Sequence, residues 1–212
     1  MIVILTAGGP EAELPDFSTL PEGVYIGVDG GTVTLMKRGI EPVAAVGDFD
    51  SVTGEELAAI SALFPGLERV PAEKEETDTE LALQKAMSFN PDQVIITGVT
   101  GGRLDHYMGA LHIIHRYHEK FPHIQFMLID RKNQIRFLNP GRHEIQRDER
   151  FRYISFYPFA EEITGLSLEG FKYPVNNETI PFGSTRFISN ELLGPGVVSF
   201  PKGHCIMIQS SD

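Results

Sequence analysis

The pattern of secondary structure changes near residue 130, and this change most constrains the fold. Before it, short apolar runs typical of buried strands alternate with segments of helical character. Strands are predicted over residues 2–5, 24–28, 43–46, 67–70, 94–97 and 124–129, and helices over residues 32–37, 53–63, 77–89 and 103–120. Such alternation predicts an open, mostly parallel α/β sheet with helices on both faces.

After residue 132 the apolar segments become short, and Gly and Pro separate them. Strands are predicted over residues 134–138, 141–146, 151–157, 163–168, 185–188, 197–200 and 205–209, with no helix. This pattern predicts an antiparallel β-sandwich. We therefore expect two domains, residues 1–132 and residues 133–212.

The composition narrows the class of protein. A net charge of −11 argues against general binding to nucleic acid, which needs a basic face. It leaves a phosphorylated ligand open, because a bound cation can locally invert the field. Residues 1–9 lack the basic region of a signal peptide, and the single Cys205 lies in an apolar run. We expect a cytoplasmic protein with no membrane partner and an inert, buried thiol.

Two carboxylates follow the predicted strand at residues 43–46. Gly47 ends the apolar run, and Asp48 and Asp50 come directly after it. Ligands of open α/β sheets collect at the carboxyl ends of the strands. Paired carboxylates suit Mg²⁺, which usually also meets phosphate. Gly-Asp and Asp-Ser are equally ordinary turn residues, so a metal site and a turn both stay open.

An acidic segment leads into the helix predicted at residues 77–89. Thr77 and Glu80 have the spacing of a capping box, and Asp78 falls in the first helical turn, where the helix dipole favours a carboxylate. Asp78 differs from a solvated helix start only if the fold turns it toward Asp48 and Asp50. Lys74 fits a surface salt bridge and a phosphate contact equally well.

A glycine-rich turn joins the strand at residues 94–97 to the next helix. A helix N-terminus after such a turn is an anion site by geometry. Gly101 and Gly102 let backbone N–H groups approach phosphate oxygens, and Arg103 can bind phosphate with two hydrogen bonds. Asp105 fits a metal ligand or a hydrogen-bond acceptor, and His106 a ligand contact.

Other polar and aromatic residues are assigned to structure. His115 and His118 are expected at the surface, because their spacing with His112 does not form one compact metal set. Phe151, Tyr153 and the pair at residues 156–157 are expected in the sheet core. Residues 189–191, Ser-Asn-Glu, are ambiguous on chemistry alone.

Five short motifs occur in a fixed order: Asp29-Gly30-Gly31, residues 47–51, Lys74 with Thr77-Asp78, residues 101–106, and Ser189-Asn190-Glu191. As an ordered set they resemble the bacterial thiamine pyrophosphokinases (thiamine diphosphokinases) over essentially the whole chain. The resemblance implies transfer of a pyrophosphoryl group from ATP to the hydroxyl of thiamine, giving thiamine diphosphate and AMP. It also implies Mg²⁺ and a homodimer whose active sites lie at the subunit interface.

The resemblance also implies roles for individual residues. The catalytic set is Asp48, Asp50, Asp78, Arg103 and Asp105, and the metal ligands among them are Asp48, Asp50 and Asp78. ATP would contact Asp29, Gly30, Gly31, Lys74, Gly101, Gly102, Arg103 and His106, and thiamine would contact Ser189 and Asn190. Asp78 and Asp105 are both candidates to accept the proton of the hydroxyl or to orient it.

Two other functions deserve comparison. Asp48-x-Asp50 after a strand resembles the nucleophile motif of haloacid dehalogenase-like phosphatases, with Asp48 phosphorylated and Asp50 the general acid. That family places the motif on its first strand and needs a later Lys and acidic pair, and the sequence lacks this set. A non-catalytic nucleotide-binding module would leave the carboxylates without a role.

Overall fold

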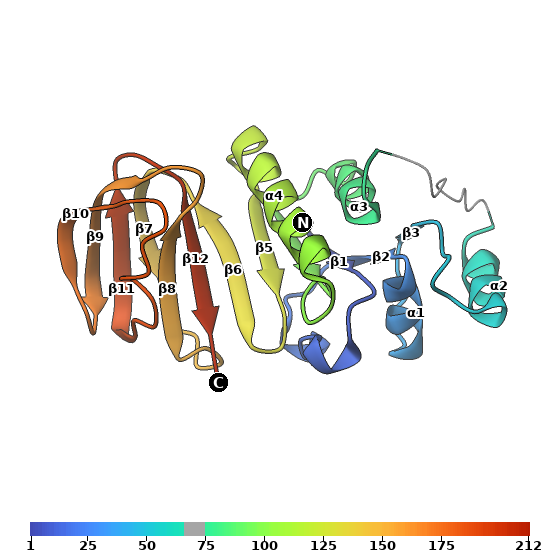
Figure 1. Cartoon of the computed structure of the whole chain (residues 1–212). Helices are drawn as coiled ribbons and strands as arrows, with labels where there is room; N and C mark the ends of the chain where they lie inside the picture. Colours follow the sequence, from blue (N-terminus) through green and yellow to red (C-terminus); the bar gives the residue numbers. More distant parts are fainter. Residues whose placement is uncertain (66–74) are drawn as a thin grey trace. The chain divides into compact units, whose positions relative to one another are not determined.

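The computed structural model describes residues 1–65 and 75–212, which form two compact units, Met1–Arg131 and Lys132–Asp212 (Figure 1). The strand expected at residues 67–70 and the predicted phosphate contact Lys74 lie outside the described residues. Among the described residues, none of the helices is both long enough and apolar enough to cross a membrane.

The described part of unit 1, which omits residues 66–74, has five parallel strands in the order β3-β2-β1-β4-β5. Their bounds are β1 (Ile2–Thr6), β2 (Val24–Val28), β3 (Ala44–Val46), β4 (Gln93–Thr97) and β5 (Gln125–Ile129). Ile4, Leu5, Ile95 and Ile96 of the central strands have no exposed surface. Burial on both faces explains why these strands appear in the sequence as unbroken apolar runs.

The α-helices described in this unit are α1 (Gly30–Lys37), α2 (Gly54–Leu63), α3 (Asp78–Met87) and α4 (Leu104–Lys120). α1 packs against β1 and β2, α3 packs against β1, β2 and β3, and α4 packs against β5 (Figure 1). Thr53 and Glu56 form the reciprocal capping box at the start of α2. Thr77 caps α3 by accepting a hydrogen bond from the backbone of Glu80, whose carboxylate pairs with Arg116 on α4.

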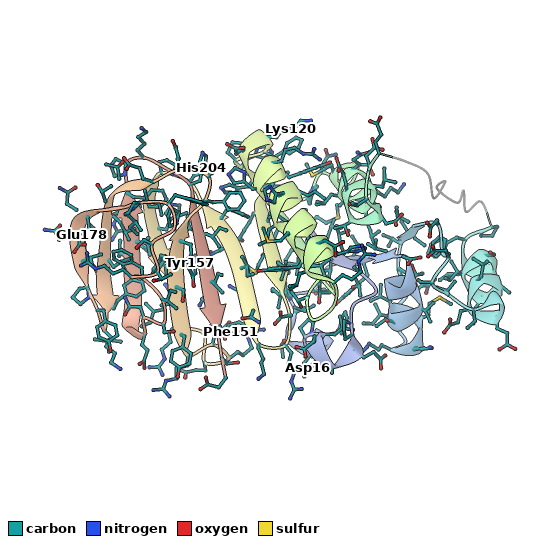
Figure 2. The ribbon with its side chains drawn as sticks, in the orientation of Figure 1. Asp16, Lys120, Phe151, Tyr157, Glu178 and His204 are labelled. Atoms are coloured by element: carbon teal, nitrogen blue, oxygen red, sulfur yellow. The ribbon has the colours of Figure 1, made fainter. Side chains whose placement is uncertain are left out.

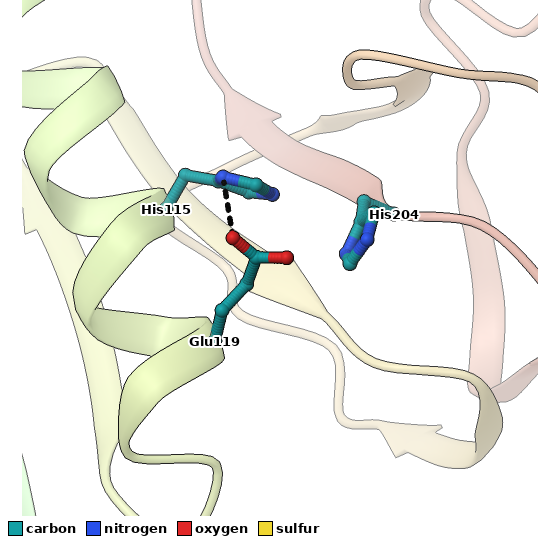
Figure 3. A group of neighbouring side chains, drawn as sticks. All are labelled: His115, Glu119 and His204. Atoms are coloured by element: carbon teal, nitrogen blue, oxygen red, sulfur yellow. Dashed lines mark ion pairs between the residues drawn. The ribbon is translucent and has the colours of Figure 1, made fainter.

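Short 3₁₀ helices at η1 (Glu11–Glu13) and η2 (Phe17–Thr19) follow β1 and were not predicted. The expectation that His118 lies at the surface is wrong, because its exposed fraction is 7%. Ile114, Tyr117 and His118 share the buried face of α4, which continues the helical period of its apolar residues. His115 is also largely covered, and its Nδ1 lies 3.5 Å from a Glu119 carboxylate oxygen (Figure 3).

Unit 2 contains two antiparallel layers and, over residues 132–212, no helix. One layer pairs β6 (Asn133–Leu138), β12 (Cys205–Ser210) and β8 (Tyr153–Pro158). The other has the order β10-β9-β11-β7, with bounds β10 (Val175–Ile180), β9 (Ile163–Phe171), β11 (Leu192–Phe200) and β7 (Gly141–Ile145).

Alternate residues of both layers of unit 2 form one apolar core. Phe156 of β8 meets Phe171 of β9 edge to face, with ring centroids 5.6 Å apart. Phe151 is buried as expected, whereas Tyr157 is only partly covered (Figure 2). Cys205 is buried, and burial raises the pKa of its thiol to about 12, which makes it inert. The predicted fold class, an open parallel α/β sheet followed by an antiparallel β-sandwich, is confirmed.

In unit 2 one predicted strand is absent and one observed strand was not predicted. Residues 185–188 form no strand, and among them Phe187 alone is buried, with its carbonyl accepting the Phe156 N–H at 2.9 Å. Conversely, β10 was missed because its sequence, Val-Asn-Asn-Glu-Thr-Ile, is mostly polar and exposed. The Gly-Pro-Gly at residues 194–196, expected to separate strands, lies inside β11.

Candidate active site

The predicted site residues of unit 1 lie at the carboxyl ends of neighbouring parallel strands. β2 leads into Asp29, β3 leads into Asp48 and Asp50, and β4 leads into the glycine-rich turn before Arg103. In the sheet, β2 lies on one side of β1 and β4 lies on the other side. This point, where the strand order reverses, is where open α/β sheets bind ligands.

Two glycines allow these loops to approach one another. A Cβ atom at Gly31 would lie 1.9 Å from the carbonyl oxygen of Thr6, and one at Gly98, whose φ is +75°, would lie 2.1 Å from the carbonyl oxygen of Ala7. No side chain fits at such distances. The loops after β1, β2 and β4 are therefore in backbone contact, which brings main-chain N–H groups to this edge of the sheet.

Three carboxylates gather at the ends of β2 and β3. One carboxylate oxygen from each of Asp29, Asp48 and Asp50 lies within 4.8 Å of the other two. The pKa of Asp50 is raised, chiefly by the charge of Asp48, then by desolvation and by the charges of Asp29 and Asp78. Asp78, at the start of α3, is therefore among the charges that act on Asp50.

The backbone and side chain of Asp29 are unusual. Its φ and ψ are 49° and −127°, a conformation that residues other than glycine rarely adopt. Its Oδ2 accepts a 2.6 Å hydrogen bond from the Ser51 hydroxyl, whereas its Oδ1 is buried and accepts no hydrogen bond from any described residue. A buried oxygen without a partner, next to two more carboxylates, fits a hard divalent cation.

The start of α4 carries a cationic side chain, Arg103, at the carboxyl end of β4. Arg103 binds the Asp105 carboxylate with two hydrogen bonds, Nε to Oδ1 at 3.1 Å and Nη2 to Oδ2 at 2.5 Å. The Arg103 guanidinium lowers the pKa of Asp105 to about 2. Gly101, with φ of +76°, and His106 are exposed beside this pair. Asp105 therefore orients Arg103 and is a poor proton acceptor.

In unit 2 the structure uses Ser189 and Asn190 differently. Asn190 is 4% exposed, its amide donates to the Tyr173 carbonyl at 2.9 Å, and its carbonyl oxygen accepts from the Tyr173 N–H at 3.0 Å. Ser189 is exposed in the left-handed conformation, and its N–H donates to the Ser155 hydroxyl at 3.0 Å. The Asn190 side chain is thus occupied inside the fold, while Ser189 is exposed.

Two residues were missed by the sequence-based assignment, Ser51 and Ser155. Ser51 lies within the quoted motif at residues 47–51, but nothing in its position indicates the contact with Asp29, 22 residues earlier. Ser155 could have been noticed as a polar residue in an otherwise apolar strand, where it is 6% exposed. The phosphatase alternative loses support, because Asp48 follows the third strand of the chain and not the first.

Known proteins are similar to this chain in sequence and in fold. Residues 21–126 match the family described as thiamin pyrophosphokinase, catalytic domain, and residues 142–205 match thiamin pyrophosphokinase, vitamin B1 binding domain. The thiamine pyrophosphokinase of Bacillus subtilis is 47% identical over 211 residues, covering 98% of each chain.

Solved structures of thiamine pyrophosphokinases have the same fold as this chain. The crystal structure of thiamine pyrophosphokinase from Bacillus subtilis superposes with a TM-score of 0.93 at 46% identity, covering 100% of both chains. That of thiamin pyrophosphokinase from Geobacillus thermodenitrificans gives a TM-score of 0.90 at 40% identity, covering 100% of this chain and 98% of the other. With sequence, fold and full-length coverage in agreement, the chain belongs to the thiamine pyrophosphokinase family.

Proposed function

We propose that this chain transfers the pyrophosphoryl group of ATP to the hydroxyl of thiamine and releases thiamine diphosphate and AMP. The observation that carries the proposal is the acidic cluster of Asp29, Asp48 and Asp50, within 4.8 Å at the strand ends of a chain of this family. Transfer of this kind requires positioning of the phosphates and neutralisation of their charge more than covalent help from the protein.

The acidic cluster is the proposed binding site for Mg²⁺. Asp48, Asp50 and Asp78 would hold the ion, with Asp29 contributing its unpartnered Oδ1. When bound, Mg²⁺ withdraws charge from phosphate oxygens. Mutual repulsion among the carboxylates makes the cluster unfavourable without a cation and favours binding of one.

The phosphates of ATP are assigned to two helix starts. Gly30 and Gly31 open α1, and Gly101 and Gly102 precede α4, so backbone N–H groups are available at both places. Arg103, held in orientation by Asp105, would bind phosphate oxygens, and His106 lies on the exposed side of the same turn. Lys74 remains a predicted ATP contact outside the described residues.

Of the two candidate proton acceptors, Asp78 is favoured. Arg103 holds the pKa of Asp105 at about 2, so Asp105 is a weak base. Asp78 lies beside the acidic cluster and can orient the attacking hydroxyl of thiamine. The negative charge of the cluster also attracts the cationic thiazolium ring.

For thiamine in unit 2 we assign Ser189 as the contact and Asn190 as its support.

We also propose a homodimer with active sites at the subunit interface. Large apolar side chains are exposed beside both sets of site residues, Leu104 (78%) next to Arg103 and Leu193 (70%) near Asn190. A second copy of the chain would cover them. Sedimentation tests this, and an active enzyme that is strictly monomeric contradicts it.

The reaction is tested by incubating the pure protein with ATP, Mg²⁺ and thiamine. AMP and thiamine diphosphate should form in equal amounts. A thiamine analogue with ethyl in place of hydroxyethyl is the matched control, because it lacks the accepting oxygen and should give neither product. Formation of ADP or free phosphate in place of AMP would contradict the proposal.

A further inference from the structure

We propose that Ser51 is a positioning residue, whose hydroxyl holds the Asp29 carboxylate so that its other oxygen stays available to a divalent cation. The inference rests on the proposed function of the acidic cluster. Ser51 itself lies one residue beyond Asp50 and contacts Asp29 through its side chain, with Oγ donating to Oδ2 at 2.6 Å.

The backbone of Asp29 is already immobilised on both sides. Its N–H donates to the Val46 carbonyl at 2.8 Å, and its own carbonyl accepts from the Thr32 N–H at 3.0 Å. A Cβ atom at Gly47 would lie 3.0 Å from the Asp29 Cα, so the loop after β3 is in close contact with this residue. The freedom that remains to Asp29 is rotation of its carboxylate.

Repulsion between neighbouring carboxylates acts on this rotation. Asp48 and Asp50 lie within 4.8 Å of Asp29 through their carboxylate oxygens, so three negative groups face one another. In the absence of a restraint, repulsion favours rotation of Asp29 away from the pair. The Ser51 hydroxyl opposes this rotation, in the way that outer hydrogen bonds orient ligands at metal sites.

The test is binding of Mn²⁺, a spectroscopic substitute for Mg²⁺, followed by electron paramagnetic resonance without ATP or thiamine. Ser51→Ala should weaken Mn²⁺ binding about tenfold. Ser51→Thr keeps the hydroxyl at an exposed position and should bind within about threefold of the unmodified protein. Ser18→Ala is the matched control, because it removes a 2.7 Å hydrogen bond from Ser18 to Asp16 elsewhere in unit 1.

A second readout is the Mg²⁺ concentration that half-saturates turnover, which Ser51→Ala should raise while Ser18→Ala leaves it unchanged. The inference is overturned if Ser51→Ala binds Mn²⁺ as tightly as Ser18→Ala. It is also overturned if Ser51→Thr binds Mn²⁺ as weakly as Ser51→Ala. Loss of folding in Ser51→Ala would also overturn it, since Ser51 would then be a structural residue. A protein that binds Mn²⁺ with this pattern yet forms no thiamine diphosphate would refute the proposed function alone.

Discussion

Asn190 hydrogen-bonds through its side chain to both backbone polar groups of Tyr173, which lies 17 residues earlier in the chain. The side-chain oxygen of Asn190, Oδ1, also accepts the Glu191 N–H at 2.9 Å. The backbone of Asn190 pairs in both directions with Ile154 of β8. These contacts hold the residue before it, Ser189, in a left-handed conformation at the surface.

Replacing Asn190 should therefore affect stability before it affects binding. Asn190→Ala removes three hydrogen bonds that its buried side chain makes with the backbone of Tyr173 and Glu191, and we expect a loss of about 2 kcal/mol in the free energy of unfolding. The midpoint of urea unfolding measures this loss. Ser189→Ala, at an exposed position, is the control and should change stability by less than about 0.5 kcal/mol while raising the KM for thiamine. An Asn190→Ala protein of unchanged stability would contradict the supporting role.

Asp50→Asn should separate activity from stability. The change removes one charge from a crowded cluster whose repulsion raises the pKa of Asp50, so the melting temperature in Mg²⁺-free buffer should not fall. Formation of thiamine diphosphate should fall at least about 100-fold. Glu55→Gln removes one exposed charge on α2 and should leave turnover unchanged. Turnover retained in Asp50→Asn would exclude Asp50 from the metal site.

Two glycine substitutions should change the free energy of unfolding in opposite directions. Gly31→Ala places a methyl group 1.9 Å from the Thr6 carbonyl oxygen and should cost about 3 kcal/mol of stability. Gly109 lies within α4, and a methyl group there would meet nothing within 4 Å beyond its chain neighbours and the backbone of its own helix, so Gly109→Ala should stabilise by about 1 kcal/mol through helix propensity. Urea unfolding of both variants measures the difference, and equal effects would contradict the close approach of β1 and α1.

Stability should also depend on pH through Glu56. Hydrogen bonds from Lys37 and then from Thr53 lower the pKa of this carboxylate to about 2, from 4.5 in the unfolded chain. A lowered pKa means that the contribution is complete above pH 4.5 and is lost as the pH falls toward 2. The difference in melting temperature between the unmodified protein and Glu56→Gln should therefore be constant from pH 7 to about 5 and shrink below it. A difference that grows on acidification would contradict this.

Local patterns in the sequence were sufficient for the alternation of strands and helices in unit 1 and for the fold class. The continuous apolar runs at β1, β4 and β5, and the capped start of α2, are predictable because they depend on neighbouring residues. The motifs that indicate the family are also local. Prediction failed where a local pattern was misleading, as at residues 185–188, where Phe187 is the one buried residue of an apparent strand.

Contacts between distant residues were decided by the tertiary structure. The parallel pairing of β2 with β3 brings Asp29 to Asp50 and Ser51, and the packing of α3 against β3 brings Asp78 to the same cluster. The sequence alone determined which chemical groups this protein carries and the class of sheet that presents them. Which oxygen is left without a partner, and which amide is consumed inside the fold, follow from pairings across many residues that no local periodicity encodes.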